Sequence, residues 1–272
     1  MLSGNLPESL SNATTLQSVL LDYNKLTGSI LASYCGMPIL QDIFVNANSL
    51  NGDLSTFIHA NCSSISLQQI SLASNQLTGT ISSRLCSSTC LPNLAHLLLA
   101  DNRLSGHIPA SLANCSSLES LMLTSNYIKG SIPAQLGRLE SLARLDVNKN
   151  NLTGSIPSTL GNCSSLYLFH FNNNRLTGPI PSTLGLLPLL KDVCLFVNSL
   201  SLETSPHFCT TAPTLNTYVF KSTISQAVYF QAFKPSNISN ISLHTEIEFL
   251  KLYRNRSGPA KACNTFTYSR IN

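Results

Sequence analysis

The chain is 272 residues long, carries a formal net charge of +4 and contains only 10% charged residues. Its basic residues form no continuous run, which argues against a nucleic-acid-binding protein. No apolar stretch reaches the roughly 18 residues that a membrane-spanning helix requires. We therefore expect membrane attachment only through a segment outside these residues.

The first residues already follow a repeating pattern. Leu2, Gly4, Leu6, Pro7 and Leu10 have the spacing that recurs further along the chain. No charged and then apolar segment, as in a secretory leader, precedes them. We therefore assign residues 1–15 to a partial first repeat and expect a fragment of a longer protein or, alternatively, a short intracellular protein.

Residues 16–202 contain eight copies of L-x-x-L-x-L-x-x-N-x-L-x-G-x-I, spaced 24 or 27 residues apart. The leading leucines are Leu16, Leu40, Leu67, Leu94, Leu118, Leu142, Leu166 and Leu190. Self-similarity at this period is the signature of a leucine-rich solenoid. The predicted fold class is an α/β solenoid, a right-handed superhelix with a parallel sheet on its concave face and a mostly irregular or 3-10 convex side.

One copy, residues 94–112, shows what each position does. Leu97 and Leu99 are two residues apart, as in a strand with one buried face, so Leu98 between them is expected on the concave side. Asn102 is expected to satisfy backbone groups that each turn leaves open, in a ladder of stacked amides. The glycine four positions later indicates a sharp bend, and a proline then holds the chain's exit in the more regular copies.

The nine cysteines are an odd number, so at least one is not paired within the chain. Cys62, Cys115 and Cys163 stand at one inward repeat position and are interpreted as buried thiols. Cys194 replaces a concave-facing residue. The disulfide candidates are Cys86 with Cys90, and Cys209 with Cys263. Zinc binding near the first pair is disfavoured because no matching ligand pair follows it.

The repeat fails after Asn198, and residues 203–272 form a divergent region that holds ten of the nineteen phenylalanines and tyrosines. Residues 217–221 and 227–233 are rich in β-branched and aromatic residues and are predicted to be strands. The region is interpreted as a degenerate cap over the last apolar edge. An insertion that interrupts the repeats, or a stretch that does not fold, are the alternatives.

Two sequence motifs, L-T-G-S-I-P at residues 152–157 and L-S-G-H-I-P at residues 104–109, resemble the plant-type leucine-rich repeat of receptor-like kinases and receptor-like proteins. The resemblance extends from Leu2 to about Leu200. It implies an extracellular recognition module at the plasma membrane that binds a peptide or small hormone-like ligand, a co-receptor, or both. Alternatives are a secreted hydrolase inhibitor, similar to polygalacturonase-inhibiting proteins, or a receptor fragment without a function of its own.

The same resemblance gives the insertion alternative a functional meaning. In the brassinosteroid and phytosulfokine receptor families an inserted island helps to form the ligand site. The corresponding candidates in this chain would be Phe220, Tyr229, Phe230 and Phe233, although no island motif is recognisable residue by residue.

Eight N-x-S/T sequons are candidate glycosylation sites, although several are expected by chance in a chain rich in serine and asparagine. They are Asn12, Asn61, Asn114, Asn151, Asn162, Asn237, Asn240 and Asn255. Three of them lie in N-C-S-S at one repeat position on the outer side, where glycans would leave a concave site open.

No catalytic constellation is recognisable. The G-x-S-x-G nucleophile elbow and the protein-kinase motifs are absent from the sequence. His96 and His170 are expected three strands apart, about 14 Å, which is too far to share a metal ion. We therefore predict no enzyme activity, no cofactor and no metal site.

One repeat position expected on the concave side reads Leu20, Phe44, Ser71, Leu98, Met122, Asp146, His170 and Cys194. Its four large apolar members are expected to point to solvent, and contiguous exposed apolar surface usually marks a contact site. The candidate ligand-binding residues are Phe44, Leu98, Met122, Arg144, Asp146, Lys149 and His170. The apolar ones would anchor a peptide that crosses the strands, and Arg144 and Asp146 would orient it. Alternatively, a partner domain covers this ridge.

Overall fold

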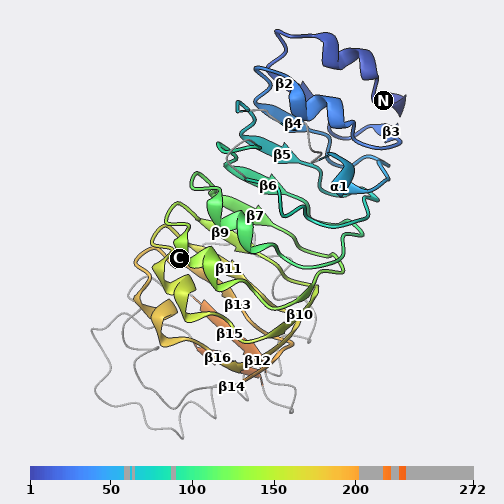
Figure 1. Ribbon diagram of the computed structural model, residues 1–272. Helices are drawn as coiled ribbons and strands as arrows, with labels where there is room; N and C mark the ends of the chain where they lie inside the picture. The colour runs from blue at the N-terminus through green and yellow to red at the C-terminus, as the bar shows by residue number, and fades with distance from the viewer. Residues whose placement is uncertain (58–61, 63–64, 87–89, 202–216, 222–226, 231–272) are drawn as a thin grey trace, which may run out of the picture.

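The protein is a curved coil in which each repeat makes one turn (Figure 1). The computed structural model describes residues 1–57, 62, 65–86, 90–201, 217–221 and 227–230, the last two ranges as backbone. Strands line one side of the coil, and short helices lie on the opposite side (Figure 1). No helix in these ranges is long and apolar enough to cross a membrane.

The main sheet takes one strand from each successive turn, and these strands are parallel. They are β2 (Ser18–Leu20), β4 (Asp42–Phe44), β5 (Gln69–Ser71), β6 (His96–Leu98), β7 (Ser120–Met122), β9 (Arg144–Asp146), β11 (Leu168–His170) and β13 (Asp192–Cys194). β15 (Thr217–Lys221) continues the sheet in parallel, and β16 (Ala227–Phe230) returns antiparallel to it. Both C-terminal strands predicted from the sequence are confirmed, the second over Ala227–Phe230, and the remaining predicted residues 231–233 lie outside the described residues.

A second line of pairing follows the glycine bends. β8 (Lys129–Gly130), β10 (Asn151–Gly154), β12 (Arg175–Pro179) and β14 (Ser199–Ser201) form a four-stranded parallel sheet. β1 (Ser3–Asn5) and β3 (Lys25–Thr27) pair in the first turns. Between these two sheets, isolated bridges join Asp53 to Thr78 and Thr80 to Ser105. The partial first repeat is therefore part of the coil, because its strand pairs with that of the next turn.

The outer side carries short helices, as predicted. The 3-10 helices are η1 (Glu8–Asn12), η2 (Ala32–Gly36), η3 (Ala110–Asn114), η4 (Ala134–Arg138), η5 (Ser158–Asn162) and η6 (Ser182–Leu186), and α1 (Leu54–Phe57) is α-helical. Pro109, Pro133, Pro157 and Pro181 each stand directly before a 3-10 helix with extended backbone angles. Proline suits this position because its ring fixes φ and its missing N–H is not needed there.

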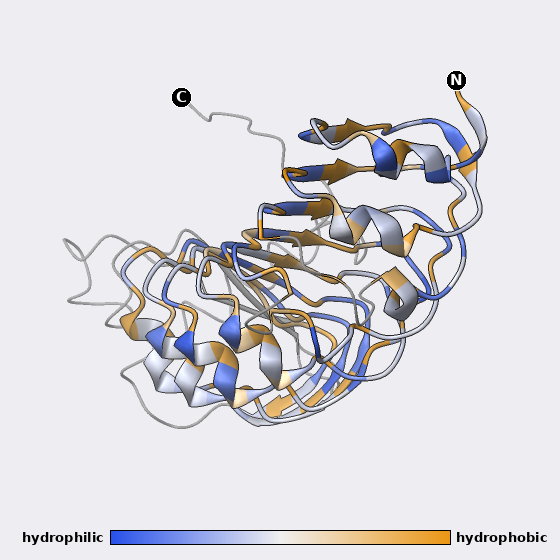
Figure 2. Ribbon diagram, turned by 45° about the horizontal axis from the view of Figure 1, so that its top comes forward, coloured by the Kyte–Doolittle hydropathy of each residue, from blue (hydrophilic) through white to orange (hydrophobic). Residues whose placement is uncertain are grey.

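The core runs along the coil axis between the strands and the outer helices. Leu94, Leu97 and Leu99 are buried, and the equivalent apolar residues of the following turns are buried as well. Apolar segments accordingly recur in successive turns of the ribbon (Figure 2). Each turn thus covers the apolar side of its neighbours, so stability is shared along the row.

The asparagine ladder is confirmed. Asn126 Oδ1 accepts a hydrogen bond from the Leu104 N–H, 2.9 Å away, in the preceding turn. Its Nδ2 donates to the carbonyls of Leu99 and Leu123 at 3.0 and 3.1 Å. Equivalent inter-turn bonds are made by Asn24, Asn48, Asn75, Asn102, Asn150, Asn174 and Asn198.

Candidate functional site

One row of side chains crosses the main sheet from strand to strand. Backbone pairing places its members opposite one another in the order Leu20, Phe44, Ser71, Leu98, Met122, Asp146, His170 and Cys194. We call these eight residues the central row. The predicted order is confirmed, and the row changes from apolar to polar between β7 and β9.

The apolar part of the central row is less exposed than predicted. Leu20 is 66% exposed, but Phe44, Leu98 and Met122 are half-buried. Neighbouring strands lie only about 4.8 Å apart, so side chains on both sides cover each of these residues. Leu20 belongs to β2, which ends the sheet, and it has such a neighbour on one side only. The apolar surface is therefore a shallow strip rather than a projecting ridge.

Two cationic side chains border the polar part of the row. Arg144 on β9 is half-buried, and its Nε donates a hydrogen bond to Ser120 Oγ at 2.9 Å. This bond turns the Arg144 side chain towards the neighbouring strand β7. Lys149 is exposed and lies in the turn after β9 with φ 51°, so it stands beside the sheet rather than on it.

Asp146 is buried at 7% exposure, which corrects its predicted role as a ligand-facing carboxylate. Its Oδ1 accepts hydrogen bonds from the Asn148 backbone N–H at 3.1 Å and from Asn148 Nδ2 at 2.6 Å. Burial by itself raises the pKa of Asp146, but hydrogen bonds from His170, Thr124 and Asn148 outweigh it and lower the pKa. The carboxylate is therefore ionised, and it accepts its hydrogen bonds from groups of the protein itself.

His170 lies between two carboxylates. Its Nδ1 is 3.4 Å from Asp146 Oδ2, and its Nε2 is 3.1 Å from Asp192 Oδ1 on β13. Burial by itself lowers the pKa of His170, but the contacts with Asp146 and Asp192 outweigh it and raise the pKa to about 9. The sequence singled out His170 but not Asp192. Aligning the last two 24-residue repeats would have placed Asp192 opposite Leu168, on the strand next to His170.

The cysteines pair differently from the prediction. Cys35 is bonded to Cys62 and Cys86 to Cys115, with Cα–Cα distances of 4.9 and 5.1 Å. The prediction of a local disulfide between Cys86 and Cys90 was therefore wrong. Cys62 and Cys115 are buried as predicted but are disulfide-bonded rather than thiols. Each bridge joins two adjacent turns, whose stacking brings the Cα atoms within the range that a disulfide needs.

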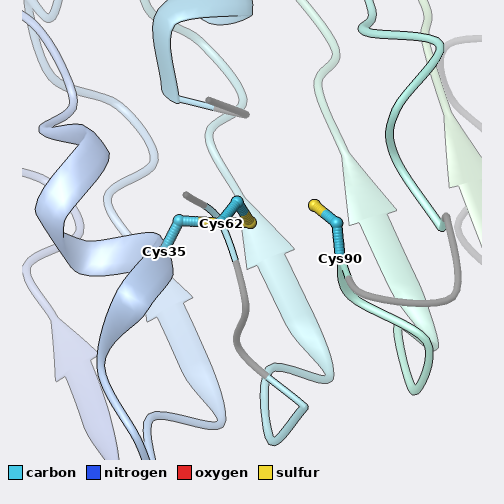
Figure 3. A group of neighbouring side chains, drawn as sticks. All are labelled: Cys35, Cys62 and Cys90. Carbon is cyan, nitrogen blue, oxygen red and sulfur yellow. A yellow bond between two sulfur atoms is a disulfide. The ribbon is translucent and has the colours of Figure 1, made fainter. Parts of the chain in front are cut away.

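Cys90 and Cys163 remain buried thiols. The Cys90 thiol lies close to the Cys35–Cys62 bridge, with the three sulfurs within 4.8 Å of one another (Figure 3). Burial raises the pKa of Cys90, and the charge of Arg84 opposes this only in part. Burial also raises the pKa of Cys163 to about 11. Since the thiolate is the reactive form, neither group suits nucleophilic chemistry. Cys209 and Cys263 lie outside the described residues.

Comparisons with known proteins agree with this architecture. Family models described as leucine rich repeat match residues 92–152 and 66–88. The leucine-rich repeat ectodomain of the plant membrane receptor kinase GASSHO1/SCHENGEN3 from Arabidopsis thaliana, solved with CASPARIAN STRIP INTEGRITY FACTOR 2, is 34% identical over 79% of this chain, with a TM-score of 0.73. The Arabidopsis receptor kinase HAESA, solved with the peptide hormone IDA and the co-receptor SERK1, is 25% identical over 83%, with a TM-score of 0.67.

The chain is a plant-type leucine-rich repeat protein. It spans only 25% of the GASSHO1/SCHENGEN3 chain and 41% of the HAESA chain. A plant ice-binding protein also shares the fold, at 25% identity over 77% of this chain and 75% of that one, with a TM-score of 0.59. No curated protein matches. Because one coil serves several purposes, the function of this leucine-rich repeat protein has to be argued from its surface.

The glycosylation candidates of the repeats can be placed in part. Asn12, Asn114 and Asn162 end the 3-10 helices η1, η3 and η5 and are exposed, and Asn151 is exposed at the start of β10. The other four, Asn61, Asn237, Asn240 and Asn255, lie outside the described residues. The three helix-end sites are on the side opposite the main sheet, so glycans there would leave the central row open.

Proposed function

We propose that this leucine-rich repeat array is a non-catalytic recognition module, the ligand-binding part of the extracellular domain of a plant receptor-like kinase or receptor-like protein. Its ligand is an extended peptide that lies across the strands of the main sheet, and a co-receptor protein is the second expected partner. The HAESA complex, which contains a peptide hormone and a co-receptor, supports both partner classes by analogy. The exposed sequons are consistent with a location on the extracellular side of the plasma membrane.

The central row carries this proposal. A peptide needs an apolar strip for its side chains and fixed polar groups that set its register and direction. Phe44, Leu98 and Met122 provide half-buried apolar contacts, which lose their remaining water when a ligand covers them. Contacts of this kind near the centre of an interface supply most of the binding free energy.

The charges next to the strip indicate the polarity of the ligand. Asp146 makes its hydrogen bonds inside the protein, whereas Arg144 and Lys149 are cationic groups at the polar end of the strip that a ligand can reach. Arginine binds carboxylates through two parallel N–H groups, which fixes direction as well as position. We therefore expect the peptide to place a carboxylate, either an acidic side chain or its C-terminus, over β9.

A selection from a displayed library of random linear peptides, using the purified chain as target, tests the proposal. Enriched peptides should contain apolar residues and a carboxylate, and Leu98→Asp or Arg144→Glu should weaken their binding at least about tenfold, or 1.4 kcal/mol. Leu186→Asp and Arg138→Glu are the matched controls, because both residues are exposed in outer-side 3-10 helices. Binding that is equally sensitive to the two pairs, or no enrichment, would count against the proposal.

A further inference from the structure

Three cysteine sulfurs meet in the core where three successive turns stack. Cys35, Cys62 and Cys90 belong to the first, second and third of the eight full repeats. Their Sγ atoms all lie within 4.8 Å of one another, and all three residues are buried. The Cys90 side chain points towards the bridge between Cys35 and Cys62 (Figure 3). A thiol therefore lies next to a disulfide that joins the two preceding turns.

The stacking of the turns decides which of the two bridged sulfurs Cys90 can bond to. Both disulfides join adjacent turns, with Cα–Cα distances of 4.9 and 5.1 Å. Cys62 and Cys90 also lie in adjacent turns, five and four residues before the next leading leucine. Cys35 and Cys90 are two turns apart, roughly 9.6 Å, which exceeds the limit of about 7 Å between the Cα atoms of a disulfide. Cys62 is therefore the partner within reach.

The backbone around Cys90 is strained. Cys86 and Leu91 have φ of 61° and 51°, in the left-handed region that residues other than glycine adopt at a cost. Local opening of this stretch releases that strain, so it costs less than opening of the regular core. In the closed core, burial raises the pKa of Cys90 and keeps the thiol protonated. In the opened stretch, contact with water returns the pKa towards its ordinary value, and the reactive thiolate forms.

We propose that Cys35, Cys62 and Cys90 form a thiol–disulfide exchange site, in which Cys62 changes its partner from Cys35 to Cys90. The Cys90 thiol loses its proton to solvent, and the thiolate attacks Cys62 Sγ. The Cys62–Cys90 bond forms as the Cys35–Cys62 bond breaks, and Cys35 leaves as a thiolate that takes up a proton. One thiol and one disulfide are present before and after, so the step consumes no oxidant or reductant. The covalent link moves by one turn, to the boundary between the two 27-residue repeats, which neither of the two disulfides crosses.

Disulfide mapping of the natural chain tests the exchange. The folded chain is incubated at pH 8 without oxidant or reductant, quenched and alkylated with a maleimide in acid, and digested with pepsin. We expect two linked peptides, Cys62 with Cys35 and Cys62 with Cys90, each accompanied by alkylation of the third cysteine. Cys163, a buried thiol that belongs to neither disulfide, should be alkylated in every species and so controls for random reshuffling. Cys62 joined to Cys35 alone would overturn the proposal.

Two serine variants separate the two possible partners of Cys90. Cys35→Ser removes the present partner of Cys62, so exposure to air should yield a Cys62–Cys90 bridge. Cys62→Ser is the matched control, because it leaves Cys35 and Cys90 two turns apart, and both should remain thiols. Alkylation of both Cys62 and Cys90 in the first variant, or a Cys35–Cys90 bridge in the second, would overturn the proposal. None of these measurements involves a peptide ligand, so this proposal and the proposed function fail independently.

Discussion

In the N-terminal half, residues 1–106, the repeats are 24 or 27 residues long, whereas in the C-terminal half, residues 107–201, they are 24 residues long. The regular half has a continuous second sheet from β8 to β14 and 3-10 helices that stack from η3 to η6. In the irregular half the second sheet is reduced to one strand pair and isolated bridges. Each disulfide joins a 27-residue repeat to the 24-residue repeat beside it.

This difference shows two ways to hold the turns of a solenoid together. When every turn has the same length, backbone groups meet in register and the hydrogen bonds of two sheets repeat without interruption. When a turn carries extra residues, that register is lost on the outer side and a covalent link between turns replaces it. The main sheet and the asparagine ladder are common to both halves, so they define the fold, and the outer side varies.

The largest effect is expected from the covalent links. Replacing Cys86 and Cys115 together by alanine removes a bridge over 29 residues of sequence and should destabilise the chain by about 2–4 kcal/mol. The matched control is Cys163→Ala, at the position of Cys115 two turns later. It loses only a buried thiol and should cost about 1 kcal/mol.

Urea unfolding with and without reductant measures this contrast. Reductant opens both bridges of the natural chain, so it should lower that chain's midpoint at least to the midpoint of the untreated double variant. It should lower the midpoint of the double variant by a smaller amount, because the Cys35–Cys62 bridge remains there. If the natural chain has the same midpoint in both conditions, the irregular half does not depend on its disulfides.

The second largest effect is expected from the asparagine ladder. Two adjacent asparagines in the regular half, one inside the ladder and one outside it, allow the same substitution to be compared. Asn150 is buried, accepts a hydrogen bond from the Ile128 N–H at 3.0 Å and donates to the Leu123 carbonyl at 2.9 Å. Asn151 is exposed. Asn150→Ala should cost about 2–3 kcal/mol because it strands buried backbone groups, and Asn151→Ala less than about 0.5 kcal/mol. Equal unfolding midpoints for the two variants would refute the ladder's contribution.

A smaller effect should distinguish the outer sides of the two halves. A Cβ at Gly137 in η4 would overlap the carbonyl oxygen of Thr159 in η5, whereas a Cβ at Gly36 in η2 would meet nothing within 4 Å. Gly137→Ala should therefore destabilise by about 1–2 kcal/mol. Gly36→Ala should be neutral or stabilise by up to about 1 kcal/mol, because alanine reduces the freedom of the unfolded chain. Thermal unfolding of both variants compares them directly, and a loss at Gly36 as large as that at Gly137 would contradict the difference in packing.

The sequence predicted the repeating features best. The register of the central row, the asparagine bonds and the prolines before the outer helices all follow from a fixed repeat length, because each position then meets its copy in the next turn. The cysteine pairing did not follow, since Cys86 and Cys115 come from repeats of different lengths. Spacing alone does not align such positions.

Contacts between different repeat positions were also missed. Asp146 was expected to face a ligand, but its carboxylate is bound by Asn148, which comes from a different repeat position. The contact between His170 and Asp192 likewise combines two positions on adjacent strands. Periodicity describes each column of a solenoid separately, whereas these sites depend on contacts between columns.

Hydroxyl-radical footprinting with a peptide from the library selection tests the central claim, that the main sheet is the recognition surface, most directly. The measurement compares oxidation of Phe44, Met122 and His170 on the sheet with that of Leu186 and Leu189 on the outer side, which are 66% and 49% exposed. Bound peptide should protect the first group and leave the second unchanged. Protection of Leu186 and Leu189 without protection of Met122 would contradict recognition through the concave sheet.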